Sequence, residues 1–150
     1  MRTPTKVNPA LIVIADHDEE ERCLLRAILK LKGFNVIEAR DGREVVELAV
    51  GKRPDLLVMD LKLPRVSGVA AIRQIRKMVD LRNLPIVTLS SVRRRRRRPG
   101  RSTAHLDKPI EYGELDVLLD RFLPGRRLSL KRGAVVDRMR GASEGKAKLF

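Results

Sequence analysis

Four residues whose types could work together chemically each end a short apolar segment of the chain: Asp16, Asp60, Ser90 and Lys108. In an open parallel sheet, sites form outside the carboxyl ends of the strands, so these residues would meet at one edge. Two carboxylates there suit Mg²⁺, a hard cation that prefers oxygen ligands and keeps several waters. A carboxylate beside the ion can accept a phosphoryl group as an aspartyl phosphate. A lysine and a hydroxyl could bind the phosphoryl oxygens, because this chemistry relies on positioning and charge neutralisation.

Each residue also has a purely structural explanation. Asp16 or Asp18 could cap the helix that follows the first strand. Ser90 could be a turn residue at a strand end, and Lys108, which precedes a proline, could be a surface charge. Asp60 is harder to explain in this way. It directly follows the apolar run Leu-Leu-Val-Met, and hydrophobic packing gives no reason for a carboxylate at that edge of the sheet. The combination of all four favours a phosphate-handling site.

The elements that would position these residues alternate along the chain. Short segments predicted to be strands span residues 10–15, 35–39, 56–60, 85–89 and 103–107, of which the first, third and fourth are apolar runs. Amphipathic spacing predicts helices over residues 19–32, 44–50, 68–79 and 115–122. This alternation implies βαβ units and therefore an α/β, doubly wound fold, with a parallel sheet and helices on both faces. The crossovers are expected to be right-handed.

The helix before the fourth strand is well marked in the sequence, whereas no helix is marked after it. Ser67 can cap the earlier helix. Its inward residues would be Val69, Ile72, Ile75 and Val79. The segment that follows the fourth strand, residues 92–101, combines adjacent like charges with a proline and offers no apolar face. We call it the Arg-rich loop.

The net charge of +14 is concentrated in two segments. Residues 92–101 contribute +7 and residues 124–150 contribute +6, so the remainder of the chain is nearly neutral. A run of like charges is usually a solvated loop or an interaction surface, and it says little about the fold. The arginines that could contact a polyanion are Arg93, Arg94, Arg95, Arg96, Arg97, Arg98 and Arg101.

Length and composition exclude several classes of protein. A chain of 150 residues is long enough for about one domain, and 43% hydrophobic residues are too many for a wholly disordered chain. Cys23 is the single cysteine, so no internal disulfide is possible. No apolar stretch approaches the roughly 20 residues of a membrane helix, and residues 1–9 lack the apolar segment of a signal peptide. We therefore expect a cytoplasmic protein that does not contact membranes.

The order and spacing of these motifs resemble the receiver domain of two-component response regulators. The resemblance covers residues 10–124 and is strongest from Pro54 to Pro64, Pro-Asp-Leu-Leu-Val-Met-Asp-Leu-Lys-Leu-Pro, followed by Ser67-Gly68. The segments 85–90 and Lys108-Pro109 add to it. It implies a flavodoxin-like (βα)5 fold with strand order 2-1-3-4-5, in which the fourth helix is degenerate or replaced by the Arg-rich loop. Residues 1–9 would then be an N-terminal extension, and residues 125–150 a basic, flexible tail.

The resemblance also assigns roles to individual residues. Asp60 matches the phosphoacceptor, and Mg²⁺ would be held by Asp16, by Asp60 and by the backbone carbonyl of Lys62. Ser90 and Lys108 match the hydroxyl and the ammonium that contact the phosphoryl group. With Ser90, His105 occupies the position of the switch residue. Such a domain is a signalling phosphoacceptor and not an enzyme, apart from its own phosphorylation and dephosphorylation.

The acidic pair after the first strand departs from the family pattern. The chain reads Asp16-His17-Asp18 where the family usually has adjacent carboxylates, and with Arg22 fixing the register, His17 takes the second position. Imidazole is a poorer partner for Mg²⁺ than carboxylate is. We therefore expect a weakened magnesium site, with either His17 or Asp18 as a further ligand.

The Arg-rich loop is the second departure. The chain between Ser90 and Lys108 is a few residues shorter than the family pattern, in a region where receivers often bind partners or dimerise. Whether a change at Ser90 is passed on to His105 is therefore an open question. The altered surface could also bind a second copy of the chain and form a homodimer.

Three functions remain open at this stage. The first is a stand-alone receiver, phosphorylated by a sensor histidine kinase or phosphotransfer protein and acting through protein–protein interaction; the 26 residues after Pro124 are too few for a helix-turn-helix domain. The second is a binding module that works without phosphorylation. The third is non-specific nucleic-acid binding through the Arg-rich loop and tail, because clustered arginines suit phosphate contacts but no aromatic residues for base stacking lie there. A solvated loop and tail would explain the charge equally well.

Overall fold

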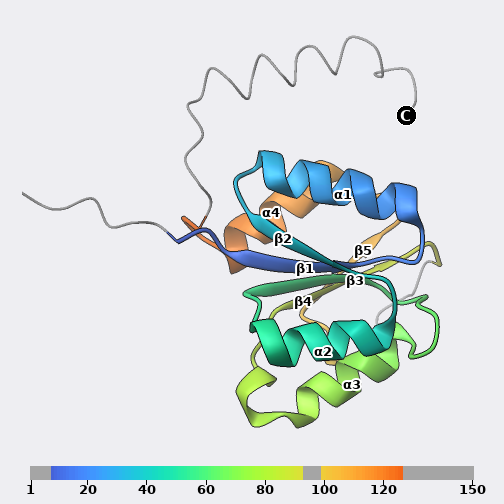
Figure 1. Ribbon diagram of the computed structural model, residues 1–150. Helices are drawn as coiled ribbons and strands as arrows, with labels where there is room; N and C mark the ends of the chain where they lie inside the picture. The colour runs from blue at the N-terminus through green and yellow to red at the C-terminus, as the bar shows by residue number, and fades with distance from the viewer. Residues whose placement is uncertain (1–7, 93–98, 127–150) are drawn as a thin grey trace, which may run out of the picture.

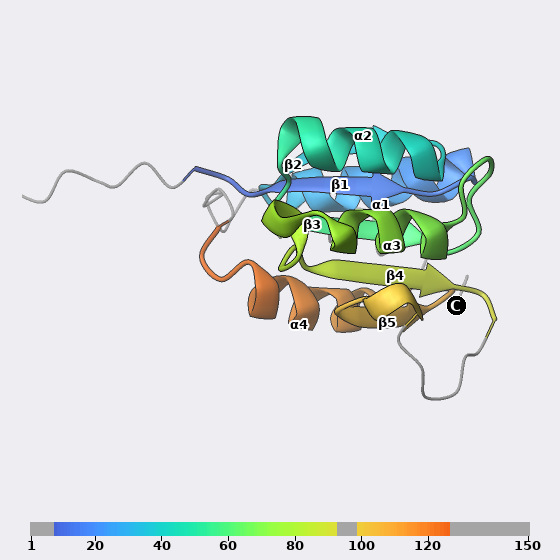
Figure 2. The same ribbon diagram turned by 90° about the horizontal axis from the view of Figure 1, so that it is seen from below.

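Five parallel strands form the centre of the computed structural model, which describes residues 8–92 and 99–126 (Figure 1). The strands are β1 (Leu11–Ala15), β2 (Asn35–Ala39), β3 (Leu56–Asp60), β4 (Ile86–Ser90) and β5 (Ala104–Asp107). They are ordered β2-β1-β3-β4-β5, and every neighbouring pair is parallel. Figure 2 shows β5 next to β4 at one edge of the sheet. The predicted doubly wound fold and strand order are confirmed.

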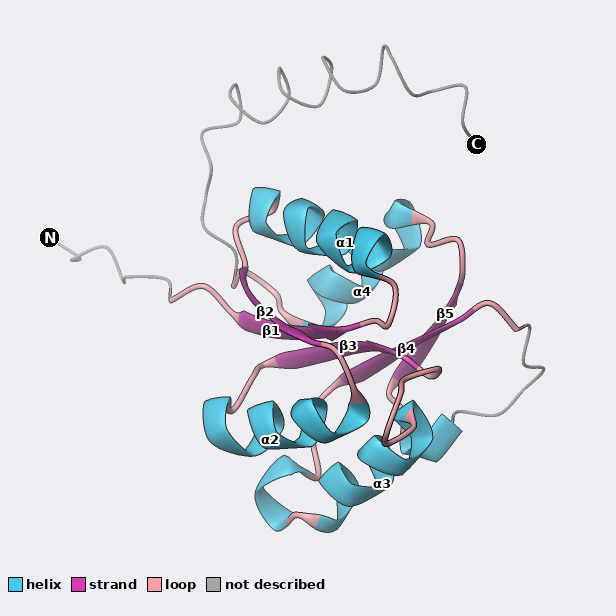
Figure 3. Cartoon of the chain, turned by 45° about the vertical axis from the view of Figure 1, so that its right-hand side comes forward, coloured by secondary structure: helices cyan, strands magenta, loops and turns pink. Residues whose placement is uncertain are grey.

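Helices cover both faces of the sheet (Figure 3). They are α1 (Glu19–Leu31), α2 (Gly42–Lys52), α3 (Gly68–Lys77) and α4 (Tyr112–Phe122), which follows β5. Helices α1 and α4 lie on one face, and α2 and α3 lie on the other. Strand β3 is buried throughout because its alternate residues enter different cores: Leu56 packs beneath α1 and α4, whereas Leu57 packs beneath α2 and α3. Among the described residues, no helix has the length and apolar character needed to span a bilayer.

Helix α3 begins as predicted but ends earlier. The hydroxyl of Ser67 accepts a hydrogen bond from the amide of Ala70, so Ser67 is the N-cap. Ile72 and Ile75 are buried, and Val69 packs partly against the same core. The prediction for Val79 was wrong, because α3 ends at Lys77 and the chain turns into the short 3₁₀ helix η1 (Val79–Leu81). There the Val79 side chain is 74% exposed.

In the described part of the connection between β4 and β5, the chain forms one short 3₁₀ helix, η2 (Pro99–Arg101), and no α-helix. Residues 93–98 of the Arg-rich loop lie outside the described residues. Turn η2 packs closely on α3, since a Cβ added at Gly100 would lie 3.2 Å from side-chain atoms of Ile72. Gly100 also has a φ of 59°, which an L side chain rarely adopts. The described end of the β4–β5 connection is therefore packed directly against α3.

Arg76 of α3 connects the chain segments around this turn. Its Nε donates to the carbonyl of Arg101 at 3.2 Å. One terminal nitrogen, Nη1, donates to the carbonyls of Leu84 at 2.7 Å, Arg82 at 3.2 Å and Leu81 at 3.3 Å. A single guanidinium thus fixes both the approach to β4 and the approach to β5.

The two ends of the described chain meet at the edge of the sheet where the strands begin. The amide of Ala10 donates to the carbonyl of Arg126, and the Arg126 side chain donates to the carbonyl of Asn8. Its guanidinium also lies 3.4 Å from the Asp55 carboxylate. Residues 1–7 and 127–150 lie outside the described residues, so the predicted extension and most of the predicted tail remain predictions.

We expect Arg76→Met to destabilise the fold by about 2–4 kcal/mol, because the carbonyls that Arg76 satisfies would lose a charged donor. Urea unfolding at neutral pH would measure this loss. Arg73→Met is the matched control, since Arg73 is an exposed arginine of the same helix. Equal midpoints for the two variants would contradict a structural role for Arg76.

Candidate functional site

The polar residues at the strand ends line an open cleft at the carboxyl edge of the sheet. The cleft has a volume of about 800 Å³ and includes Asp60, Ser90, Lys108 and His17 in its lining. Asp16 lies directly beneath, bonded to Lys108. The parallel register of β1, β3, β4 and β5 brings these residues together from distant parts of the sequence.

Two buried carboxylates share one ammonium group at the centre of the cleft. Asp16 and Asp60 are each 3% exposed. The Lys108 Nζ donates to the Oδ2 of Asp16 at 2.7 Å and to the Oδ2 of Asp60 at 2.8 Å. It also contacts the carboxylate of Glu21, from the first turn of α1. Three carboxylates therefore surround one lysine, which leaves the group with excess negative charge.

Burial and hydrogen bonding act in opposite directions on these groups. Burial raises the pKa of Asp16 above its ordinary value, although hydrogen bonds from Lys108 and from the Asp18 amide partly oppose this. Burial by itself would lower the pKa of Lys108, but its hydrogen bonds to Asp16, Asp60 and Glu21 outweigh that effect and raise it. Lys108 is therefore a permanent cation in this site.

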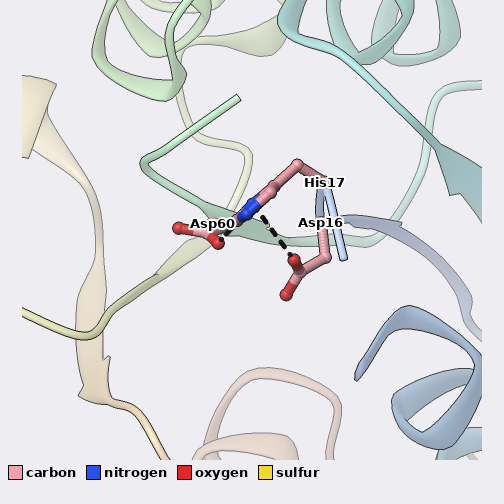
Figure 4. Close-up of side chains that lie close together, drawn as sticks. All are labelled: Asp16, His17 and Asp60. Carbon is pink, nitrogen blue, oxygen red and sulfur yellow. Dashed lines mark ion pairs between the residues drawn. The ribbon is translucent and has the colours of Figure 1, made fainter. Parts of the chain in front are cut away.

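His17 faces both buried carboxylates (Figure 4). Its Nδ1 lies 3.3 Å from the Oδ2 of Asp60 and 3.6 Å from the Oδ1 of Asp16. The His17 side chain is 45% exposed, so it covers the carboxylates from the solvent side. Ligand atoms of the three residues all lie within 4.8 Å of one another, as atoms that bind one metal ion do.

Asp18 lines the cleft, and its carboxylate bonds to the start of α1. Its carboxylate accepts a hydrogen bond from the amide of Glu21 and caps α1, and this bond lowers the pKa of Asp18. The Asp18 amide donates to the Oδ1 of Asp16 at 2.9 Å. The buried Arg22 holds the same loop by donating to the carbonyl of Asp16 at 2.7 Å. Of the two possible caps, Asp18 is the cap of α1, at the rim of the cleft, whereas the buried Asp16 bonds to Lys108.

The first residues of α2 and α3 pack closely against the loop that follows Asp60. A Cβ at Gly68 would lie 2.7 Å from the Cα of Leu61, and a Cβ at Gly42 would lie 2.0 Å from the carbonyl oxygen of Val66. Only glycine allows α3 and α2 to begin so close to this loop. Within it, the Lys62 amide donates to the Oδ1 of Asp60 at 2.9 Å. Lys62 lines the cleft, and the assignment of its carbonyl as a metal ligand remains a prediction.

Ser90 is turned toward the start of the Arg-rich loop. Its hydroxyl accepts from the amide of Val92 at 3.1 Å and donates to the carbonyl of Val92 at 3.2 Å. The Ser90 carbonyl accepts from the Lys108 amide at 2.8 Å. Ser90 lines the cleft, and the polar contact shown for its hydroxyl is with the Val92 backbone.

His105 lies beneath the surface beside β4. Its Nδ1 is 2.8 Å from the hydroxyl of Thr88, the residue opposite it in the register of β4 and β5. Its Nε2 lies 3.5 Å from the Asp107 carboxylate. The histidine thus contacts the middle of β4 and not the cleft, and its predicted switch role remains a prediction.

Glu21 and Val92 were missed by sequence reasoning. Glu21 is one of three acids in the first turn of α1, a pattern that by itself indicates only a helix N-terminus. Its spacing from Asp16, just over one helical turn after the strand, is the signal that could have placed it at the same edge. Val92 contributes backbone atoms alone, and no sequence pattern marks such a contact. Of the seven arginines predicted to contact polyanions, the structure describes Arg101 alone.

Comparisons with known sequences agree with these features. The profile of the response regulator receiver domain matches residues 12–119. The polar-differentiation response regulator DivK of Brucella anthropi is 31% identical over 106 residues, covering 68% of this chain and 86% of DivK. The response regulator MprA of Mycolicibacterium vanbaalenii is 34% identical over 143 residues, covering 95% of this chain but 58% of MprA. The chain thus spans little more than half the length of MprA.

Solved structures show the same fold. The receiver domain of the sensor histidine kinase PA1611 from Pseudomonas aeruginosa, with a magnesium ion coordinated in its active-site cleft, aligns with a TM-score of 0.70 and 27% identity. The alignment covers 76% of this chain and 97% of that domain. The Saccharomyces cerevisiae receiver domain of Ssk1, crystallised with the histidine phosphotransfer protein Ypd1, aligns with a TM-score of 0.71 and 20% identity, covering 81% and 94% of the two chains.

We expect Lys108→Met to make stability fall with rising pH. Without the ammonium, the pKa of Asp16 moves further above its unfolded value, so ionising this carboxyl costs more in the folded state. The variant should be close to the unchanged protein near pH 4 and about 2–4 kcal/mol less stable near pH 7. Urea unfolding in a chelating buffer at both pH values would measure the difference.

Lys62→Met is the control for this prediction, because Lys62 is an exposed lysine that lines the same cleft. A loss of stability in Lys108→Met that does not change with pH would contradict the shared-ammonium interpretation.

Proposed function

Because the chain belongs to the response regulator receiver domain family of two-component signalling, we propose that Asp60 accepts a phosphoryl group from a sensor histidine kinase or a phosphotransfer protein. The observation that carries the proposal is the pair of buried carboxylates, Asp16 and Asp60, bound to the same Lys108 ammonium. A carboxylate with no such role would be costly to bury next to another carboxylate. The cleft above Asp60 is open to a donor.

The chemistry follows from the contacts of Asp60. A carboxylate oxygen of Asp60 attacks phosphorus, the new O–P bond forms, and the N–P bond of the phosphohistidine breaks with its electron pair returning to the imidazole. The Lys108 ammonium, already 2.8 Å from Asp60, pairs with the phosphoryl oxygens as their charge replaces that of the carboxylate. The Lys62 amide keeps the Asp60 side chain in place by its bond to Oδ1.

The donor set fits a divalent cation. Asp16 and Asp60 offer two buried carboxylates, and Mg²⁺ commonly binds through one or two carboxylates while keeping several waters. We propose that these carboxylates and the Lys62 carbonyl hold Mg²⁺, with weaker affinity because His17 stands in place of a second adjacent carboxylate. When bound, the ion neutralises charge between the carboxylates and the phosphoryl group.

The signal leaves the site through Ser90. To reach a phosphoryl group on Asp60, the Ser90 hydroxyl must release the backbone of Val92, the first residue of the Arg-rich loop. We propose that the resulting change is recognised by a downstream protein in the cytoplasm, or by a second copy of the chain. The complex of Ypd1 with the Ssk1 receiver shows that receivers of this fold meet phosphotransfer proteins. We propose the same class of donor here.

A phosphorylation-independent binding module is the second candidate, and one observation favours it. His17 and Lys108 already contact both buried carboxylates, so each carboxylate has polar partners before any ion binds. Beryllofluoride with Mg²⁺ separates the two functions, because it mimics the phosphoryl group on an aspartate. An amide NMR spectrum that does not change on addition of beryllofluoride and Mg²⁺ would support the phosphorylation-independent binding module. Non-specific nucleic-acid binding remains a prediction for segments that lie mostly outside the described residues.

We expect a small-molecule phosphodonor with Mg²⁺ to add one phosphoryl group to the chain, and Asp60→Asn to abolish this addition. Lys108→Gln should slow it by at least about a hundredfold, because a group that stabilises developing charge is lost. Intact mass spectrometry over time would measure both. Asp107→Asn is the matched control, since Asp107 is an exposed aspartate at the same edge. Equal labelling of Asp60→Asn and the unchanged protein would exclude the proposal.

We also expect the amide resonance of Val92 to shift when beryllofluoride and Mg²⁺ are added, because its acceptor Ser90 would turn away. Ser90→Ala should lack this ligand-induced shift while still binding beryllofluoride. Two-dimensional amide NMR would record it, with the Ala10 amide at the opposite edge as the internal reference. A Val92 resonance that stays in place while Asp60 responds would refute the coupling.

A further inference from the structure

We infer that the cluster of His17, Asp16 and Asp60 binds a first-row transition-metal ion of the Co²⁺ or Zn²⁺ kind more tightly than Mg²⁺. The inference depends on the proposed function only for what the ion does after binding. Its basis is a donor set of one imidazole nitrogen and two carboxylates, gathered from two strand ends.

The distances within the cluster suit a single ion. Metal–nitrogen and metal–oxygen bonds of about 2.1 Å place neighbouring ligand atoms about 3.0–3.4 Å apart, for octahedral or tetrahedral arrangements. The Nδ1 of His17 lies 3.3 Å from an Asp60 oxygen and 3.6 Å from an Asp16 oxygen. Small side-chain adjustments would therefore complete the ligand geometry, with the backbone unchanged.

The ligand types decide which ion is preferred. Mg²⁺ and Ca²⁺ prefer oxygen ligands, whereas imidazole suits the later first-row ions. The affinity of a mixed nitrogen and oxygen site generally rises from Mn²⁺ through Co²⁺ toward Cu²⁺. Replacing one carboxylate by His17 removes a charged oxygen ligand from a Mg²⁺ site and adds the ligand that a transition-metal ion binds better.

Charge and exposure also leave room for a dication. Asp16, Asp60 and Glu21 bring three carboxyl groups to the single ammonium of Lys108, so carboxyl groups outnumber the cation that they surround. The polar contacts that the structure shows for the His17 ring are both with carboxylates. Its partial exposure gives an ion in the cleft a path to this nitrogen.

Metal titration of the full chain, purified without a histidine tag and stripped with chelator, tests the inference. Co²⁺ binding would be followed by visible absorption, and Mg²⁺ binding by competition. We expect one Co²⁺ per chain, bound at least about tenfold more tightly than Mg²⁺. His17→Gln should weaken Co²⁺ binding at least about tenfold and alter the absorption band. His17→Asp should strengthen Mg²⁺ binding and remove the preference for Co²⁺.

His105, the second histidine of the chain, is present in all three proteins and serves as the built-in control for binding by any other imidazole. Unchanged Co²⁺ affinity and absorption in His17→Gln would overturn the inference, as would Mg²⁺ binding as tight as Co²⁺ binding in the unchanged protein. Phosphorylation of Asp60 together with either result would refute the inference and leave the proposed function standing. Co²⁺ binding that depends on His17, without phosphorylation of Asp60, would support the inference and refute the proposed function.

Discussion

The burial of two carboxylates side by side is the constraint on which the rest of this structure depends. Asp16 and Asp60 are almost fully removed from solvent, and such groups need nearby cations or strong donors to stay ionised. Lys108 follows β5, which pairs with neither β1 nor β3. Its ammonium therefore reaches Asp16 and Asp60 only when β1, β3, β4 and β5 keep their order in the sheet. The tight helix starts at Gly42 and Gly68 serve the same end, because they fix the loop that orients Asp60. The site thus depends on the strand order and on these tight helix starts together.

His17 and Glu21 change how that requirement is met. A second adjacent carboxylate would add negative charge at the place where His17 brings an imidazole within 3.3 Å of Asp60. Glu21 restores a carboxylate, but on the first turn of α1 and against Lys108. A carboxyl group therefore stands on α1, in contact with Lys108, and an imidazole stands directly after Asp16. The imidazole adds a nitrogen donor beside the two buried carboxylates, while Lys108 gains a third carboxyl contact. A metal preference and a firmly held lysine follow from the same rearrangement.

The strands, the helix faces and the four strand-end residues could be predicted from the sequence, because each depends on local periodicity or on the rule that parallel strands end at a common edge. The choice of Asp18 over Asp16 as the helix cap could not, since both fit the spacing and the buried Arg22 decides between them by holding the Asp16 carbonyl. Val79 is exposed because α3 ends at Lys77, and the spacing of the apolar residues does not indicate this end. The contacts of Arg76 were hidden because their acceptors are backbone carbonyls, which carry no residue signature.

The two basic segments of the chain leave the folded body at opposite edges of the sheet. Residue 93 directly follows Val92, whose backbone is bonded to the Ser90 hydroxyl in the cleft. The tail follows Arg126, which is fixed to Asn8 and Asp55 where the strands begin. An event at Asp60 can therefore act on the first segment through a single hydroxyl, whereas it would have to cross the full length of β1 or β3 to act on the second. Because both cores are closely packed along these strands, the second route would require the sheet itself to move. The two basic segments therefore differ in their distance from Asp60: one begins beside the Ser90 hydroxyl, and the other begins at the far edge of the sheet.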